Sequence, residues 1–228
     1  MCNASVVESI KAVATSNEIT TEYYFPSAVY SIIKADLVPS ALLVANEQLA
    51  LSRKERPKLD NLYPVRMTGN FYADPRVAEL TDAIGQISWG ILSGQGHSME
   101  NVSVMFHEFW CQEHHRHSAM DEHIHANGAQ ITGFYFLETP KGCSNAVIHD
   151  PRPGKKQINL METNISNATA ASTAIHFTPT PGMLLFTNAW LPHSFSRHGA
   201  AKPIKFIHFT LGVQYHAPSS PVPAVEII

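Results

Sequence analysis

Apolar residues recur at helical spacing in the first half of this chain. Residues 41–53 carry such a pattern and end in a basic stretch before Pro57. Residues 75–92 repeat it after a start signal, with Asp74 placed as N-cap and Pro75 at the first helical position. The sequence therefore predicts two amphipathic helices, each of which needs an apolar surface to cover.

The apolar segments become short after residue 100, and Gly, Pro and Asn separate them. They predict strands over residues 102–110, 130–137, 146–149, 175–178, 183–188 and 204–213. An earlier strand is expected over residues 23–30, interrupted by Pro26. Many short strands at this spacing are typical of an antiparallel sandwich or barrel. We expect a mainly β fold in which the two helices pack on one sheet, because each helix must bury its apolar stripe.

The length of 228 residues suits one well-buried core and is short for two domains. The first 22 residues are polar and weakly patterned, and residues 217–228 are rich in Pro and Ser. The expected organisation is an N-terminal arm (1–22), a single domain (23–216) and a C-terminal tail (217–228).

Composition narrows the classes of protein that remain. Apolar residues make up 44% of the chain and charged residues 15%, which favours an ordered globular protein. A net charge of -3 argues against nucleic acid and acidic membranes as partners. No apolar run approaches the roughly 18 residues that span a bilayer, and the N-terminus lacks a signal-peptide pattern. Three scattered cysteines fit a reducing compartment, so we expect a cytoplasmic protein.

Histidine is the unusual residue, with 13 copies. His123 and His125 precede the strand at 130–137, and side chains two apart on an extended chain share a face, which Asp121 can join. Such imidazole pairs suit Fe, Zn, Cu or Ni. His193 follows a Pro-Gly turn and a strand about 70 residues later. A lone strand histidine is usually a surface residue, but the three together predict a metal site. The denser segment 114–117 is charged and fits a solvated or supporting role better.

Five short motifs stand in order over about residues 60–213. They are His123-Ile-His125, Thr132-Gly-Phe-Tyr-Phe-Leu-Glu-Thr-Pro140, Ile148-His-Asp-Pro-Arg152, Pro181-Gly182 and Trp190-Leu-Pro-His193, with Phe209-Thr210 beyond them. This series resembles the 2-oxoglutarate/Fe(II)-dependent oxygenase superfamily, most closely a group frequent in bacteria and marine phages. The resemblance implies a double-stranded β-helix (a cupin-like jelly roll), Fe(II), and 2-oxoglutarate and O2 as small-molecule cosubstrates. It also implies a dioxygenase, expected to be a hydroxylase, that couples oxidative decarboxylation of 2-oxoglutarate to substrate oxidation.

The resemblance assigns His123, His125 and His193 as metal ligands and catalytic residues. The superfamily standard is His-x-Asp/Glu, and no histidine of this chain is followed two residues later by Asp or Glu. The site then has three histidines, or a carboxylate joins it from Asp121 or Asp150. Both arrangements stay open, because cupin-like dioxygenases also include carboxylate-free ligand sets.

The far carboxylate of 2-oxoglutarate needs a cation, normally an Arg on the strand after the distal His. This chain offers Lys202, nine residues after His193, and Lys205 and Arg197, each of which could equally be a solvated cation. Tyr135 could donate a hydroxyl or could simply be packing.

Asp150-Pro-Arg152 also permits two interpretations, a local turn with an internal ion pair or a role in substrate binding. Two other functions remain open for the whole chain. One is a cupin-like metal dioxygenase or isomerase without 2-oxoglutarate, and the other is a non-enzymatic jelly-roll binding module. The sequence does not indicate the primary substrate, and a homodimer also remains open.

Overall fold

The computed structural model describes residues 19 and 21–217. The predicted arm (1–22) and tail (217–228) lie almost entirely outside the described residues, so they and the single domain between them stay predictions. Within the described part of the chain, none of the helices combines the length and hydropathy needed to cross a bilayer.

Both predicted helices are present, with their ends shifted by two or three residues from the predicted ranges. Helix α1 runs over Val38–Glu55 after a 3-10 turn, η3 (Ala35–Leu37). Helix α2 runs over Ala78–Gly94. The start signal at Asp74-Pro75 works as predicted, because the Asp74 carboxylate accepts a hydrogen bond from the backbone N–H of Arg76. The turn that it caps is a short 3-10 segment, η4 (Pro75–Val77), that leads into α2.

Within the described residues, ten strands form two antiparallel sheets, which include the six strands predicted after residue 100. The strand expected over residues 23–30 instead begins at Val29, and three short strands at 65–67, 120–123 and 193–195 were not predicted. In chain order the ten strands are β1 (Val29–Ile33), β2 (Val65–Met67), β3 (Val102–His114), β4 (Met120–His123), β5 (Ala129–Glu138), β6 (Ala146–His149), β7 (Ala174–Phe177), β8 (Met183–Asn188), β9 (His193–Phe195) and β10 (Ile204–Tyr215). A 3-10 segment, η5 (Pro153–Gln157), lies between β6 and β7. The larger sheet has the order β1-β8-β5-β10-β3-β2, and the smaller has the order β4-β9-β6-β7.

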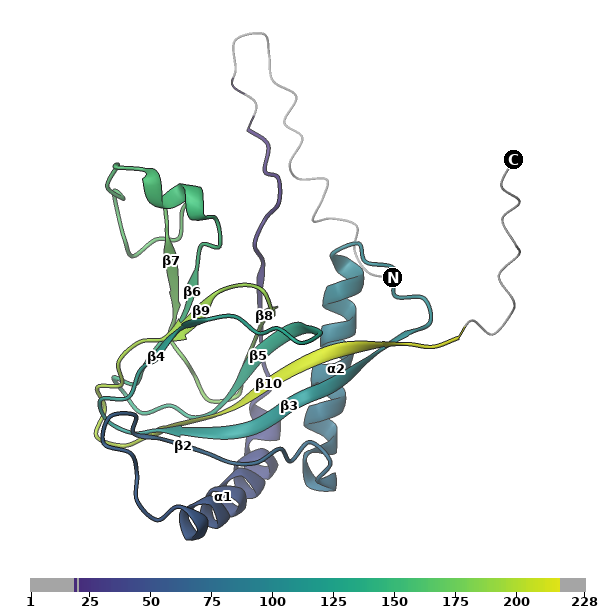
Figure 1. Ribbon diagram of the computed structural model, residues 1–228, viewed down its shortest axis with the longest axis vertical. Coiled ribbons are helices and arrows are strands. Elements are labelled where there is room, and N and C mark those ends of the chain that lie inside the picture. The colour runs from purple at the N-terminus through teal and green to yellow at the C-terminus, as the bar shows by residue number, and fades with distance from the viewer. Residues whose placement is uncertain (1–18, 20, 218–228) are drawn as a thin grey trace.

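The two faces of the larger sheet bury different partners (Figure 1). On one face, helix residues such as Leu49 and Ile84 pack against Phe109, Ile207 and other strand residues in the larger core. On the opposite face, Phe134 and its neighbours on β5 and β10 pack against the smaller sheet in a second, aromatic core. This arrangement confirms the expected fold, a jelly-roll sandwich with both helices on one sheet.

The close packing of the larger sheet requires a glycine at its centre. An added Cβ at Gly133, on β5, would lie 2.3 Å from the carbonyl oxygen of Leu185 and 2.4 Å from the Phe209 ring. Neither neighbour has room to accept a side chain without moving the backbone. The motif Thr132-Gly133 therefore has a packing reason that is independent of any chemistry.

Candidate metal centre

Two short strands of the smaller sheet bring the predicted histidines together. His123 ends β4 and lies directly opposite His193, the first residue of β9, so both side chains point to the same face. His125 lies two residues beyond β4, where its backbone N–H donates to the Ala189 carbonyl over 2.9 Å. The ring of His123 lies 4.4 Å from that of His193 and 5.3 Å from that of His125, measured between centroids.

The ring nitrogens of these histidines are arranged as metal ligands require. The Nδ1–H groups of His123 and His193 donate to the carbonyls of Asp121 and Leu191, each two residues earlier, over 2.8 and 3.0 Å. These bonds leave Nε2 with a free lone pair in both rings. One ring nitrogen from each of the three histidines lies within 4.8 Å of the other two. The Nε2 atoms of His125 and His193 are buried and find no hydrogen-bond partner among the described residues.

Burial keeps the rings of His125 and His193 neutral, which is the form that binds metal. Burial is the main cause that lowers the pKa of His193 to about 3 and that of His125 to about 4. Phe134 contributes to that apolar surrounding, with its ring centroid 5.6 Å from that of His193. The three histidines together offer a preformed set of nitrogen donors to a metal such as Fe(II).

A carboxylate lies beside this set, on strand β3. The Oε2 atom of Glu108 accepts hydrogen bonds from Nε2 of His208 and from the hydroxyl of Thr210, both over 3.1 Å. The same oxygen lies 3.6 Å from Nδ1 of His125. The hydrogen bond from His208 is the main cause that lowers the pKa of Glu108, so the carboxylate is ionised near neutral pH. Glu108, His125 and His208 form a second group close enough to hold a metal.

The histidines border a cavity of about 390 Å³. It is lined by Tyr63, Met67, Trp110, Gln112, Met120, Asp121, His123, His125 and His208. No lysine or arginine is among these lining residues. The indole Nε1 of Trp110 is buried and has no hydrogen-bond partner within the described residues. Gln112 accepts a hydrogen bond from Nε2 of the buried His114 over 2.8 Å, which leaves its amide nitrogen as a donor.

The four residues predicted to bind the cosubstrate do not gather at this cavity. Lys202 is exposed in the loop before β10, where its carbonyl accepts from His198. Arg197 is also exposed, and its guanidinium donates to the carbonyl of His117.

Lys205 and Tyr135 lie on the helix-facing side of the larger sheet. The ammonium of Lys205 contacts Glu138 over 2.8 Å and donates to Asn46 of α1 over 2.9 Å. The buried hydroxyl of Tyr135 donates to the carbonyl of Lys34 over 2.6 Å. The side chains of both residues point to the face of the sheet opposite to that of His208, whose side chain faces the interior between the two sheets. Lys205 is thus ion-paired within the protein, and the buried Tyr135 fits the packing alternative.

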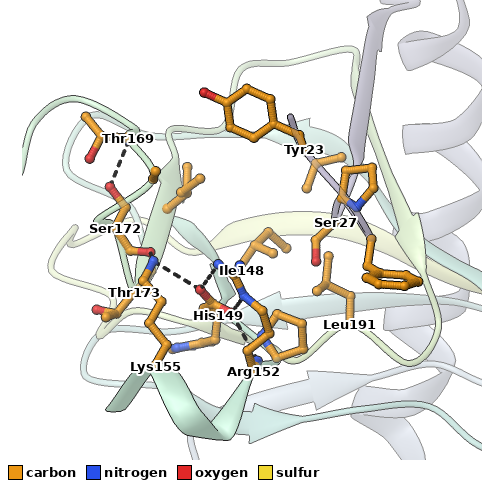
Figure 2. Close-up of a pocket in the computed structure, with 18 of the residues that line it drawn as sticks. Tyr23, Ser27, Ile148, His149, Arg152, Lys155, Thr169, Ser172, Thr173 and Leu191 are labelled. Atoms are coloured by element: carbon orange, nitrogen blue, oxygen red, sulfur yellow. Dashed lines mark hydrogen bonds and ion pairs between the residues drawn. The ribbon is translucent and has the colours of Figure 1, made fainter. Parts of the chain in front are cut away.

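The two aspartates considered as further ligands have different surroundings. Asp121 is exposed at the rim of the cavity, and neither aspartate belongs to the two ligand groups found among the described residues. Asp150 lines a different cavity of about 360 Å³, between β6, β7 and the segment before β1 (Figure 2). There its carboxylate pairs with Arg152 over 2.7 Å and with Lys155 over 3.1 Å. The motif Asp150-Pro-Arg152 is thus a locally paired turn in this structure.

Sequence reasoning missed Glu108 and His208 as members of the site. Glu108 lies opposite Thr210 in the pairing of β3 with β10, and His208 lies on the same face two residues earlier. Alternation along each strand predicts which residues share its face, but the register between two strands far apart in the chain is not visible in the sequence. The density of polar residues on two otherwise apolar strands was the available signal.

Comparisons with known proteins agree with this geometry. Residues 108–203 match the model of a family described as "Putative 2OG-Fe(II) oxygenase", a segment that includes all three predicted ligands. No curated protein matches the sequence.

Solved structures share the fold at low sequence identity. A prolyl-4-hydroxylase from Pseudomonas putida is 11% identical with a TM-score of 0.54, covering 82% of this chain and 92% of that one. AviO1 from Streptomyces viridochromogenes Tue57 is 11% identical with a TM-score of 0.55, covering 86% and 92%. SnoN, a non-heme alpha ketoglutarate dependent epimerase from nogalamycin biosynthesis, is 12% identical with a TM-score of 0.51, covering 89% and 87%.

The matched segment and the shared fold confirm the resemblance drawn from the motifs. Residues 108–203 are similar to the 2OG-Fe(II) oxygenase family, and the chain shares its fold with the prolyl-4-hydroxylase.

Proposed function

We propose that this chain is a hydroxylase that couples decarboxylation of 2-oxoglutarate to insertion of one oxygen atom into a C–H bond of its primary substrate. The observation that carries the proposal is the group of His123, His125 and His193, of which His123 and His125 line an open cavity. Two of their Nε2 atoms are buried without a partner, and such atoms are costly unless a ligand satisfies them.

These residues fit Fe(II), which His123, His125 and His193 would hold through ring nitrogens. The cavity lined by His123 and His125 offers room for 2-oxoglutarate and O2. Bound Fe(II) would activate O2, so that one oxygen atom goes to 2-oxoglutarate as it is oxidised to succinate and CO2 and the other goes into the C–H bond of the substrate. The protein's part is to orient the imidazoles through the carbonyls of Asp121 and Leu191.

The cavity supports binding of 2-oxoglutarate by neutral donors. Its lining contains no lysine or arginine among the described residues, but the Nε1–H of Trp110 has no partner and the Gln112 amide has a donor to spare. A charge balance makes this arrangement reasonable. Fe(II) with three neutral histidines carries two positive charges, which match the two negative charges of 2-oxoglutarate. A site with a ligand carboxylate would need one further cation for the same balance.

The proposed function is tested by following succinate and CO2 from 2-oxoglutarate with purified protein, Fe(II) and O2. We expect slow Fe(II)-dependent turnover without a primary substrate, and loss of turnover in the variant His123→Ala. The exposed His176 on β7 provides a matched control, because it belongs to neither group of possible metal ligands. Iron binding without any 2-oxoglutarate consumption, with or without candidate substrates, would instead support a cupin-like dioxygenase.

A further inference from the structure

Resting on the proposed metal site, we propose that Glu108 is a positioning residue that orients His125 and favours the tautomer that leaves its Nε2 free for the metal. The nearest carboxylate to the three-histidine group therefore acts from behind one ligand instead of binding the metal itself. Contacts around the three rings carry this inference.

Each of the three histidines has an oxygen atom next to Nδ1, but only His125 has a charged one. For His123 and His193 the oxygen is a neutral backbone carbonyl two residues earlier. For His125 it is the Glu108 carboxylate, at 3.6 Å, a charge contact slightly longer than a hydrogen bond. A carboxylate behind a metal-binding imidazole favours the Nδ1–H tautomer and makes Nε2 a stronger donor to the metal.

The Glu108 carboxylate is itself fixed in this position. His208 and Thr210, both on β10, donate to the same oxygen that faces His125. The ring of His208 also stacks on that of His125, with centroids 4.8 Å apart and planes 25° apart. His208 and Thr210 are largely buried, so the carboxylate is held by a rigid strand and not by a loop. Such rigid support is what a residue needs to orient a ligand.

The geometry also argues against Glu108 as a direct ligand of the three-histidine site. The Glu108 carboxylate lies within 4.8 Å of ligand atoms of His125 and His208. His123 and His193 form a separate group with His125, and that group does not include Glu108. Nε2 of His125 is the atom without a partner, and Nδ1 is the atom that faces Glu108. His125 therefore lies between the metal position and the carboxylate.

The test titrates the full-length, metal-free protein with Co(II) alone and measures stoichiometry, dissociation constant and the visible absorption of the bound metal. We expect one Co(II) per chain for the unmodified protein. Glu108→Gln should weaken binding by about 10- to 100-fold, the usual cost of losing such a supporting partner. The control Glu122→Gln removes an equal charge from β4, where Glu122 contacts His149 and none of the three ligands. It should leave Co(II) affinity unchanged.

Thr210→Val tests the same idea with less disturbance, since it keeps the carboxylate and removes one of its two hydrogen bonds. It should weaken Co(II) binding less than Glu108→Gln, and it serves where that variant does not fold. The proposal is overturned by unchanged affinity and absorption in both variants. It is also overturned by two Co(II) ions per unmodified chain with one lost in Glu108→Gln, since Glu108 would then ligate a second metal. Failure of the proposed metal site gives a different result, namely unchanged Co(II) binding in His193→Ala.

Discussion

His123 and His193 are oriented by the same local device, a hydrogen bond from Nδ1–H to the carbonyl two residues earlier. The device needs only an extended backbone, so each short strand supplies a correctly oriented ligand without help from the rest of the fold. His125 lies beyond its strand and uses a side chain from β3 instead. The three ligands thus differ in what holds them, and substitutions should affect them differently.

Replacing His193 tests the ligand assignment at the residue scale. His193→Ala removes a fully buried donor from a set of three, so we expect the bound Fe(II) to fall from one per chain to nearly none under anaerobic dialysis. His176→Ala on the exposed face of β7 should keep one Fe(II) per chain. Full iron occupancy in the His193 variant would remove this residue from the site.

His114 gives a pH-dependent test that is separate from the metal. Burial lowers its pKa from 6.5 to about 3, so the folded protein keeps this ring neutral while the unfolded chain protonates it. The stabilisation is fully present above about pH 6.5 and is lost as the pH falls towards 3. Between these values, each unit by which the pH falls should reduce the free energy of unfolding by about 1.4 kcal/mol through this group.

Urea unfolding of the metal-free protein at pH 5, 6 and 7 measures this slope. The variant His114→Gln has no titrating group at this position, so its free energy of unfolding should depend less steeply on pH over the same range. Equal slopes for the two proteins would show that His114 does not stay neutral in the folded state.

At this scale the sequence predicted what alternation along one strand determines. His123 and His125 share a side because they are two residues apart, and His193 was found through its turn and motif. Glu108 and His208 were not predicted as site residues, since their contact depends on the register of β3 against β10 across about 100 residues of chain. Lys205 was expected at the cosubstrate, but alternation places it opposite to His208, with its ammonium among Glu113, Glu138 and Asn46.

At the scale of elements, the long segments were predictable and the short ones were not. Helices α1 and α2 and the strands β3, β5 and β10 carry enough apolar residues for their spacing to be seen. The three-residue strands β2 and β9 carry too few residues to show alternation. Strand β4 has only four, and two of them are exposed acidic residues. The metal ligands lie on or next to β4 and β9, so their positions came from motifs instead of from periodicity.

Gly133 provides a prediction for the larger sheet. Gly133→Ala places a Cβ against the Leu185 carbonyl and the Phe209 ring, so we expect a loss of about 1–3 kcal/mol or more in the free energy of unfolding. Gly90 is an exposed residue within α2 with nothing near an added Cβ. Gly90→Ala should therefore stabilise the protein by about 0.5–1 kcal/mol. Urea unfolding of both variants checks the pair, and a neutral effect of Gly133→Ala would contradict the packing described for β5.

For the molecule as a whole, the two faces of the larger sheet have separate tasks. One face carries the helices and most of the aliphatic core, which stabilises the fold. The other faces the smaller sheet, where aromatic packing around Phe134 borders the histidines. The mainly β class and the covering helices followed from the sequence pattern, because each segment has one clear apolar face. The cavity beside the histidines did not, because it forms where side chains from β3, β4 and β10 meet.

The site departs from the family pattern in two ways, since it lacks a ligand carboxylate in the His-x-Asp/Glu position and, among the described residues, a cation at the cavity. The net charge of the site links these two departures. A ligand carboxylate and a cosubstrate-binding cation cancel each other, so a site that lacks both keeps the same overall charge with Fe(II) and 2-oxoglutarate bound. The site fits this condition, since the described lining of the cavity contains no lysine or arginine and the three proposed ligands are imidazoles, which bind a metal in their uncharged form. The missing carboxylate and the missing cation therefore compensate each other in charge, and together they are consistent with binding of Fe(II) and 2-oxoglutarate.

Anaerobic titration of the Fe(II)-loaded protein with 2-oxoglutarate tests the central claim most directly. Chelation of Fe(II) by the 2-oxo acid gives a weak visible charge-transfer band, which requires both the metal and two open positions next to each other. We predict that the band rises and saturates at one 2-oxoglutarate per chain in the unmodified protein and in His176→Ala, and that it is absent in His193→Ala. A protein that holds one Fe(II) at the three histidines but shows no band at saturating 2-oxoglutarate would contradict the account.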